Sequence, residues 1–127
     1  MDILLVDDNA DYLLLLREAL YTSGYNVFLA RNGVEARDVL ECSDVDLIVS
    51  ALRMSRLDGL KLHSYARSID RHKKTKFVFI VNDDDSVAGL LKLDPVLDFT
   101  LHKSTPMREF VQFVDSLTLK RFEDEWA

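Results

Sequence analysis

The sequence predicts an α/β fold in which helices cover both faces of a five-stranded parallel sheet. Two observations predict it. Short apolar runs alternate with amphipathic stretches along the chain, and the clearest of these runs are apolar at consecutive positions. A strand that is apolar at consecutive positions is buried on both faces, as in a parallel sheet covered by its crossover helices. Regular alternation specifies this architecture, and 127 residues suffice for one such domain.

Each element has a local justification. The expected strands are apolar runs that stop at polar residues or turns, and they cover residues 3–6, 25–29, 45–52 (centred on 47–49), 77–81 and 96–101. The expected helices have an apolar face and cover residues 11–23, 34–41, 59–70 and 87–93, with a last helix that begins at 106 and has a charged end at 120–127. Gly24 ends the first helix, Asn32-Gly33 turns the chain before the second, and Pro95 breaks the fourth. Thr105 is the expected N-cap of the last helix, with Pro106 at its first position.

Composition and charge exclude several classes of protein. Sixteen Lys and Arg against 22 Asp and Glu give a net charge of -6, so the chain is not expected to bind nucleic acid by itself. No apolar run approaches the roughly 18 residues of a membrane helix, and the acidic N-terminus is unlike a secretion signal. The single cysteine, Cys42, is expected to be a buried small residue in a reduced, cytoplasmic protein.

Polar residues that end the strands are the candidate functional residues, because ligands bind at the carboxyl edge of such sheets. Asp7 and Asp8 follow the first strand, where adjacent carboxylates suit Mg²⁺, although capping of the next helix is the commoner role. Lys103 ends the fifth strand and either pairs with an anion or is simply solvated. The acidic run 83–85 is expected to start a helix. The three histidines are too scattered for a metal site and are expected at the surface; they are His63, His72 and His102.

The order and spacing of several motifs resemble a response-regulator receiver domain over nearly the whole chain. The matching pieces are ILLVDDN at 3–9, ARNGVEA at 30–36, DLIV at 46–49, the stretch 54–59 that ends in Asp-Gly, and Lys103. The resemblance implies a flavodoxin-like sheet with strand order 2-1-3-4-5 and a role in two-component phosphorelay signalling. It also implies an aspartate on the third strand that accepts a phosphoryl group, Mg²⁺ on the acidic pair, and phosphoryl contacts from a Thr or Ser after the fourth strand and from Lys103.

The residue at the phospho-acceptor position departs from the family pattern. Asp46 and Asp58-Gly59 fix the register from both sides, which places Ala51 at that position. A methyl group offers no nucleophile, so no phosphorylation is expected there. Ser50 should point to the opposite face of the strand, and Ser55 stands where the family usually has proline.

The switch residues of the family are also altered. Asn82 stands in place of the Thr or Ser after the fourth strand. Phe99 lies four residues before Lys103, whereas the family's switch aromatic lies three before it, where this chain has Thr100. A shift of one residue turns a strand side chain to the other face, so the aromatic switch is expected to be lost unless a bulge restores it.

Arg53 is an unusual neighbour for a Mg²⁺ site. We expect its guanidinium, helped by Lys103, to take the place of the metal and pair with Asp7 or Asp8, so that Mg²⁺ binds weakly or not at all. The alternative is that Arg53 points to solvent and only Lys103 makes the pair.

These residues predict a pseudo-receiver rather than an enzyme. Residues 1–120 would form the domain, and 121–127 a helix end or the start of a linker. It would bind a signalling partner such as a histidine kinase or output domain, or a second copy, through its first helix or through the last two helices and fifth strand. Leu14 and Leu15 are either part of such a surface or buried between neighbours. The alternatives are phosphotransfer through another residue and an unrelated flavodoxin-like small-ligand binder, although the chain has no Gly-rich phosphate loop.

Overall fold

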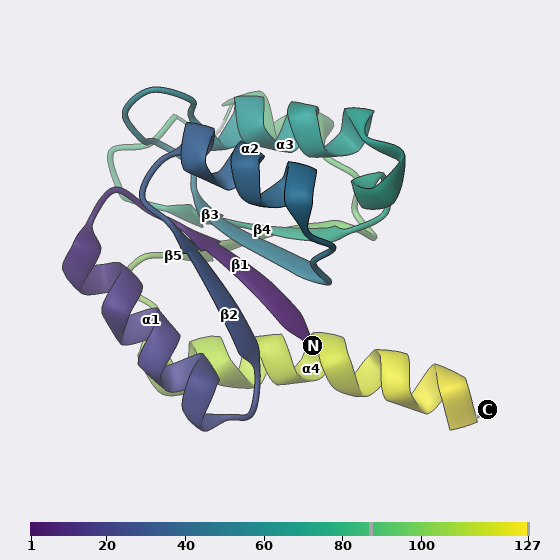
Figure 1. Ribbon diagram of the computed structural model, residues 1–127. Coiled ribbons are helices and arrows are strands. Elements are labelled where there is room, and N and C mark those ends of the chain that lie inside the picture. Colours follow the sequence, from purple (N-terminus) through teal and green to yellow (C-terminus); the bar gives the residue numbers. More distant parts are fainter. Residues whose placement is uncertain (87, 127) are drawn as a thin grey trace.

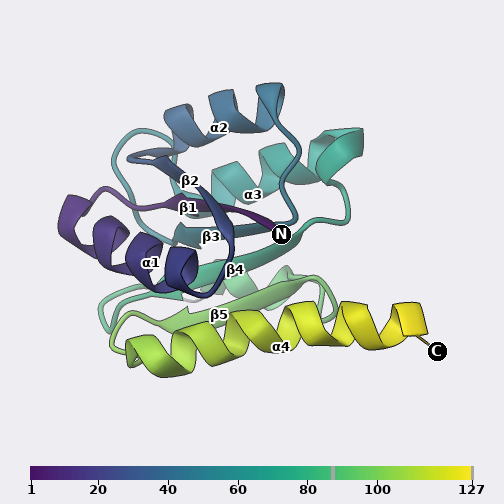
Figure 2. The same ribbon diagram turned by 60° about the horizontal axis from the view of Figure 1, so that its bottom comes forward.

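The computed structural model describes residues 1–86 and 88–126 and places a parallel five-stranded sheet between two layers of helices (Figures 1 and 2). The sheet order is β2-β1-β3-β4-β5, as predicted. The strands are β1 (Asp2–Val6), β2 (Asn26–Ala30), β3 (Leu47–Ala51), β4 (Lys76–Val81) and β5 (Asp98–His102). The α-helices are α1 (Ala10–Thr22), α2 (Gly33–Cys42), α3 (Gly59–Ser68) and α4 (Met107–Trp126), and two 3₁₀ helices are η1 (Asp70–His72) and η2 (Ala88–Lys92).

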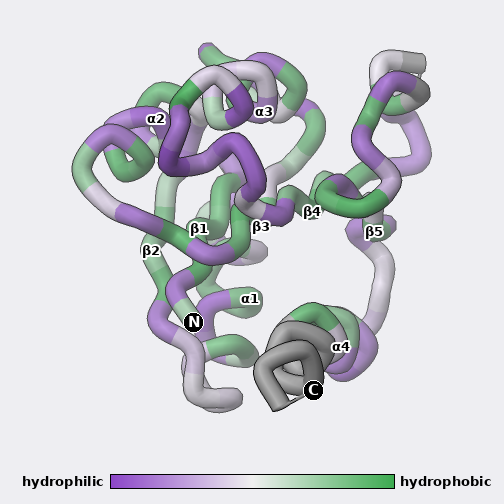
Figure 3. The backbone as a smooth tube through the Cα atoms, turned by 90° about the vertical axis from the view of Figure 1, so that its right-hand side faces the viewer, coloured by the Kyte–Doolittle hydropathy of each residue, from purple (hydrophilic) through white to green (hydrophobic). Residues whose placement is uncertain are grey.

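Two hydrophobic cores lie on the two faces of the sheet. Ile3 and Leu5 of β1 point to the side of α1 and α4, whereas Leu4 and Val6 point to the side of α2 and α3. Because successive strand residues point to opposite faces, a strand covered on both sides must be apolar at every position. Figure 3 shows the hydrophobic colour along the middle strands and the hydrophilic colour on the turns around them.

Side-chain caps fix the start of three helices at the carboxyl edge of the sheet. Asn9, Asn32 and Asp58 each accept a hydrogen bond from a backbone N–H in the first turn, of α1, α2 and α3 respectively. These bonds satisfy backbone donors that the helix itself leaves unpaired. They also hold the loops that carry the candidate site, because each cap follows within a few residues of a strand end.

The fourth predicted helix is the main difference from the expected elements. Residues 87–93 were expected to be α-helical, but η2 is a short 3₁₀ helix, and Val87 lies outside the described residues. The Asp94 carboxylate accepts hydrogen bonds from the N–H groups of Val96 and Leu97, so the chain turns at once toward β5. A side-chain turn beside Pro95 leaves too little chain for the two α-helical turns that were expected.

Three predictions about single residues are wrong. Cys42 is exposed, since Ala36 and Leu40 of α2 face the core and put the end of that helix outside. His72 is fully buried beneath η1, where its ring nitrogens contact Thr75 Oγ1 and the Leu40 carbonyl, both at 3.3 Å. His63 is largely buried against β4.

The sequence left two alternatives open for Leu14 and Leu15, and the structure excludes burial between neighbours, since both side chains are exposed. Across residues 1–86 and 88–126, no helix is long and apolar enough to cross a membrane.

Candidate functional site

The candidate site lies at the carboxyl edge of the sheet, where β1, β3 and β5 end. Asp7 directly follows β1, Ala51 is the last residue of β3, and Lys103 directly follows β5. Backbone bonds hold two of them in place: the Asp7 N–H donates to the Ala30 carbonyl at 3.2 Å, and the Lys103 N–H donates to the Val81 carbonyl at 2.8 Å. The parallel sheet therefore brings these residues, 96 apart in sequence at the extremes, to one place.

Asp7 is a buried carboxylate with partners from the chain itself. It is only 2% exposed, and its Oδ1 accepts a hydrogen bond from the Asn9 N–H at 2.9 Å. Its Oδ2 lies 3.5 Å from the Lys103 Nζ. Burial raises the pKa of Asp7 above its ordinary value, although the Asn9 N–H and the Lys103 charge act in the opposite direction. Lys103 is thus the cation that balances Asp7.

Tyr12 closes the inner side of this pair. The Lys103 ammonium lies 4.6 Å from the centre of the Tyr12 ring, a distance at which the ring face attracts a cation. Burial, and then the charge of Asp7, raise the pKa of Tyr12 to about 12. The phenol therefore stays neutral and contributes its ring rather than a charge.

Asp8 points away from its neighbour. It is exposed, and its Oδ2 accepts a hydrogen bond from the Ser55 N–H at 3.4 Å. The helix cap of α1 is Asn9, so neither aspartate has the capping role that the sequence left open. In the described ranges 1–86 and 88–126, no group of three His, Cys, Asp or Glu residues could hold a metal. The donor set therefore lacks the carboxylate on β3 that the family resemblance implies beside the acidic pair.

Arg53 does not pair with Asp7 or Asp8, and the structure thereby corrects the first expectation for this residue. Its Nε lies 3.6 Å from Asp85 Oδ1, and its side chain is 69% exposed whereas that of Asp85 is 4% exposed. Asp85 also accepts a hydrogen bond from the Asn82 N–H at 2.7 Å. A buried carboxylate needs a partner, and Asp85 lies within reach of Arg53. Among the described residues, Lys103 is the one cation paired with Asp7, as in the alternative expectation, but the mostly exposed Arg53 pairs with Asp85 instead of only facing solvent.

The side chain of Ala51 is buried. The neighbouring Ser50 does not bring a hydroxyl group to the same face of β3. Ser50 is fully buried and donates a hydrogen bond to the Ala51 carbonyl, and the strand alternation turns its side chain to the opposite face. Gly59 packs so closely on β3 that an added Cβ would lie 2.4 Å from the Ala51 carbonyl oxygen. The start of α3 therefore sits directly against the end of β3.

The residues at the switch positions of β5 lie on the faces that regular strand alternation predicts. β5 pairs with β4 in unbroken register from Asp98 to His102, so no bulge brings Phe99 to the other face. Phe99 packs edge-on against Phe113 of α4, with ring centres 5.6 Å apart, while Thr100 is exposed. Asn82 is exposed just beyond β4, and its backbone N–H bonds to Asp85.

A hydrogen-bonded chain of three side chains beside Lys103 was missed from the sequence. His102 Nε2 lies 2.5 Å from Asp83 Oδ1, and its Nδ1 lies 2.7 Å from Ser104 Oγ. The Ser104 backbone N–H also donates to Nδ1, so Nδ1 is the unprotonated nitrogen and Nε2–H faces the aspartate. His102 and Asp83 are 19 residues apart in sequence, and the strand register that pairs Val81 with His102 brings them together. The sequence alone does not give that register.

A second missed cluster lies under β5 on the side of α3. The Asp98 carboxylate accepts a hydrogen bond from Arg67 at 2.6 Å and contacts His63 Nε2 at 2.9 Å. Arg67 also donates to the carbonyls of His72 and Thr75. An aspartate at the start of an apolar strand was the available sequence signal, and its role is to tie α3 to β5.

The chain is similar to known proteins over most of its length. Residues 3–115 match the family described as the response regulator receiver domain. The response regulator MprA of Mycobacterium bovis is 42% identical over 126 residues, which cover 98% of this chain and 53% of that protein. The transcriptional regulatory protein GlrR of Escherichia coli is 40% identical over 67 residues, which cover 53% of this chain and 15% of that protein.

Solved structures agree with the fold. A response regulator receiver protein from Pseudomonas putida is 27% identical with a TM-score of 0.79, covering 91% of this chain and 95% of that one. The chemotaxis protein CheY4 of Vibrio cholerae, with a TM-score of 0.81 and 21% identity, covers 91% of this chain and 96% of that one, and shows the fold alone.

Proposed function

The chain belongs to the response regulator receiver family, a family of signalling modules, and we propose that it signals by binding a partner protein without carrying a phosphoryl group on β3. The observation that carries this proposal is Ala51 at the end of β3, at the phospho-acceptor position that the family spacing gives. Ser50, the nearest hydroxyl in the strand, is buried on the other face and bonded to a carbonyl. No side chain at that position can attack phosphorus. Because the chain belongs to this family, we no longer propose the alternative of an unrelated flavodoxin-like small-ligand binder.

The charges of the pocket support the same proposal. Asp7 is balanced by Lys103, and Arg53 is engaged with Asp85. A Mg²⁺ ion would find one exposed carboxylate, that of Asp8, and gives up its waters reluctantly. Mg²⁺ binding is therefore weak in this proposal, and no cofactor is required.

The partner surface proposed here is the outer groove between α1 and β2. Ala10, Leu14, Arg17 and Tyr21 recur at intervals of four and three residues and so share one face of α1. Two pockets of 320 and 300 Å³ follow one another along this face against β2. The apolar residues Leu14, Tyr21, Phe28 and Leu29 are all exposed there. Exposed apolar grooves of this kind accept helices of partner proteins.

The partner class in this proposal is a histidine kinase, an output domain or a second copy of the chain. The chain spans about half of MprA, 53% of its length, which leaves room for an output domain in relatives of that kind. Residues 1–120 form the receiver in this proposal, and 121–127 the end of α4 or the start of a linker. A cytoplasmic location is part of the same proposal.

One observation favours a second candidate, phosphotransfer through another residue. Ser104 Oγ has a base, His102 Nδ1, within hydrogen-bond distance, and Asp83 orients that base. This is the arrangement that activates a serine hydroxyl. A phosphoserine would differ from an aspartyl phosphate in its stability to hydroxylamine.

The proposal is tested by intact-mass analysis after incubation with acetyl phosphate and Mg²⁺. The wild-type chain should gain no phosphoryl group, and the Ala51→Asp variant serves as the positive control for the rest of the pocket. A stoichiometric, hydroxylamine-stable gain that Ser104→Ala abolishes would establish the second candidate. A hydroxylamine-labile gain in the wild-type chain would refute the main one.

A further inference from the structure

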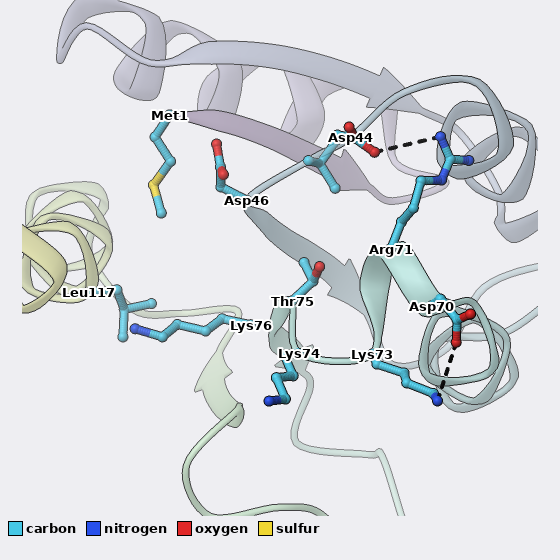
Figure 4. A pocket seen from close by; sticks show the side chains of 11 residues that line it. Met1, Asp44, Asp46, Asp70, Arg71, Lys73, Lys74, Thr75, Lys76 and Leu117 are labelled. Atoms are coloured by element: carbon cyan, nitrogen blue, oxygen red, sulfur yellow. Dashed lines mark ion pairs between the residues drawn. The ribbon is translucent and has the colours of Figure 1, made fainter.

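A separate pocket lies at the opposite, amino-terminal edge of the sheet, away from the acidic site. It has a volume of 530 Å³, within the range of small-molecule sites. The pocket is lined by Met1, the segment 44–46, Asp70, Arg71, the segment 73–76 and Leu117 of α4, and we call it the basal pocket (Figure 4). Its walls therefore come from the N-terminus, the loop before β3, η1 and the loop that leads from it to the first residue of β4, and α4.

The basal pocket contains cations without protein partners. Arg71 pairs with Asp44 at 3.5 Å, and Lys73 pairs with Asp70 at 3.2 Å (Figure 4). Among the described side chains, those of residues 1–86, 89–90 and 92–117, no ion pair or hydrogen bond involves Lys74 or Lys76. Two ammonium groups at one pocket of a chain with net charge -6 are a local surplus of positive charge.

Asp46 is the acidic residue just before β3, the strand that pairs with β4. Among the described side chains, it forms no ion pair with Lys74 or Lys76. Asp46 lies on the far wall beside Met1 and accepts a hydrogen bond from the Asp2 N–H at 2.8 Å (Figure 4). Lys76 is the first residue of β4 and is half-buried, and its side chain extends across the pocket toward Leu117 (Figure 4). The β4 backbone thus fixes the point at which the Lys76 side chain enters the pocket.

An apolar wall completes the pocket. Val45 and Leu117 are buried members of the two cores, and Met1 is partly buried against the core of α1 and α4. We propose that the basal pocket binds a small organic anion, whose acidic group lies between Lys74 and Lys76 and whose apolar body rests on Met1, Val45 and Leu117. Charge-assisted contacts orient the acidic group, and burial of the apolar body adds affinity. This site is independent of the proposed function, because it lies at the other edge of the sheet.

The test is an NMR titration of the ¹⁵N-labelled full chain with naphthalene sulfonate as the probe. Saturable shifts are expected at the amides of Thr75, Lys76 and Leu117. Inorganic sulfate tests the anion without an apolar body, and naphthol tests the apolar body without the charge. Both should bind at least about tenfold more weakly, since each lacks one of the two contributions.

The matched variants are Lys74→Gln/Lys76→Gln and Lys61→Gln/Lys92→Gln, which remove the same charge from the pocket and from exposed positions elsewhere. The first should weaken binding of the sulfonate by about tenfold or more, and the second should leave it unchanged. Equal affinity of both double variants, equal affinity for naphthol, or shifts confined to the groove of α1 and β2 would each overturn the proposal.

Discussion

Cations lie at both edges of the sheet, but the carboxylates that pair with them differ in burial. At the carboxyl edge, Lys103 and Arg53 face Asp7 and Asp85, whose side chains are almost fully buried. At the amino edge, Arg71 and Lys73 face Asp44 and Asp70, whose side chains are 82% and 95% exposed. Burial of the carboxylate, rather than the presence of a cation, separates the two edges.

This difference has an energetic consequence. An exposed pair is screened by water and contributes about 0–1 kcal/mol to stability. A buried carboxylate that loses its cation is left uncompensated, which is destabilising by roughly 3–5 kcal/mol in fully buried cases. Lys103 is therefore committed to the fold, whereas Lys73 at the amino edge is paired with an exposed carboxylate.

The largest expected effect is at Lys103. Lys103→Met should lower the free energy of unfolding by about 3 kcal/mol at neutral pH, because Asp7 then stays buried without its cation. Burial already raises the pKa of Asp7, so the folded chain holds that proton more readily than the unfolded chain does. Stability therefore falls as the pH rises from the ordinary pKa of Asp7 through its raised value, and the loss in the variant should shrink on acidification. Urea unfolding at several pH values measures this.

The control for that variant removes both charges. Asp7→Asn/Lys103→Met should recover most of the lost stability, because no unpaired carboxylate remains. An equal loss in the double variant would show that packing of the Lys103 chain on Tyr12, not charge, stabilises this edge.

A smaller effect is expected at Arg53. Arg53→Ala should lower the free energy of unfolding by about 1 kcal/mol, since the guanidinium is mostly exposed and Asp85 keeps its bond from the Asn82 N–H. The same variant should leave Mg²⁺ affinity unchanged, because Arg53 does not contact Asp7 or Asp8. A rise in Mg²⁺ affinity, measured by amide shifts around Asp8, would return Arg53 to the metal position.

The smallest effect is expected at the amino edge. Lys73→Gln should change the free energy of unfolding by less than about 0.5 kcal/mol, because both members of its pair with Asp70 are exposed. Thermal unfolding beside the wild-type chain checks this. A loss as large as that of Lys103→Met would remove the distinction between the two edges.

The sequence predicted the parts of the site that follow from strand ends alone. Asp7 and Lys103 each follow an apolar run, so parallel strands had to bring them to one edge. The partner of Arg53 could not be predicted, because it depends on the conformations of the loops after β3 and after β4. The contact of His102 with Asp83 likewise needs the register of β4 and β5.

The same limit applies to the helices. The apolar faces that predicted α1, α2 and α3, with Gly24 and Asn32-Gly33 at their ends, are local features, so those elements were expected close to their observed positions. η2 is shortened by the turn that Asp94 forms with residues beyond it, and the burial of His72 depends on Leu40, 32 residues away. The contact of His72 with Leu40 is tertiary, and such contacts leave no periodic trace in the sequence.

The most direct test of the central claim, that the carboxyl edge holds its own cation and lacks a third carboxylate, is a Mg²⁺ titration of the wild-type chain and of Ala51→Asp. Amide shifts at Asp8 and at position 51 report the binding. Ala51→Asp should bind Mg²⁺ at least about tenfold more tightly, because it supplies the missing oxygen ligand. Equal and saturable binding by the two chains would contradict the claim.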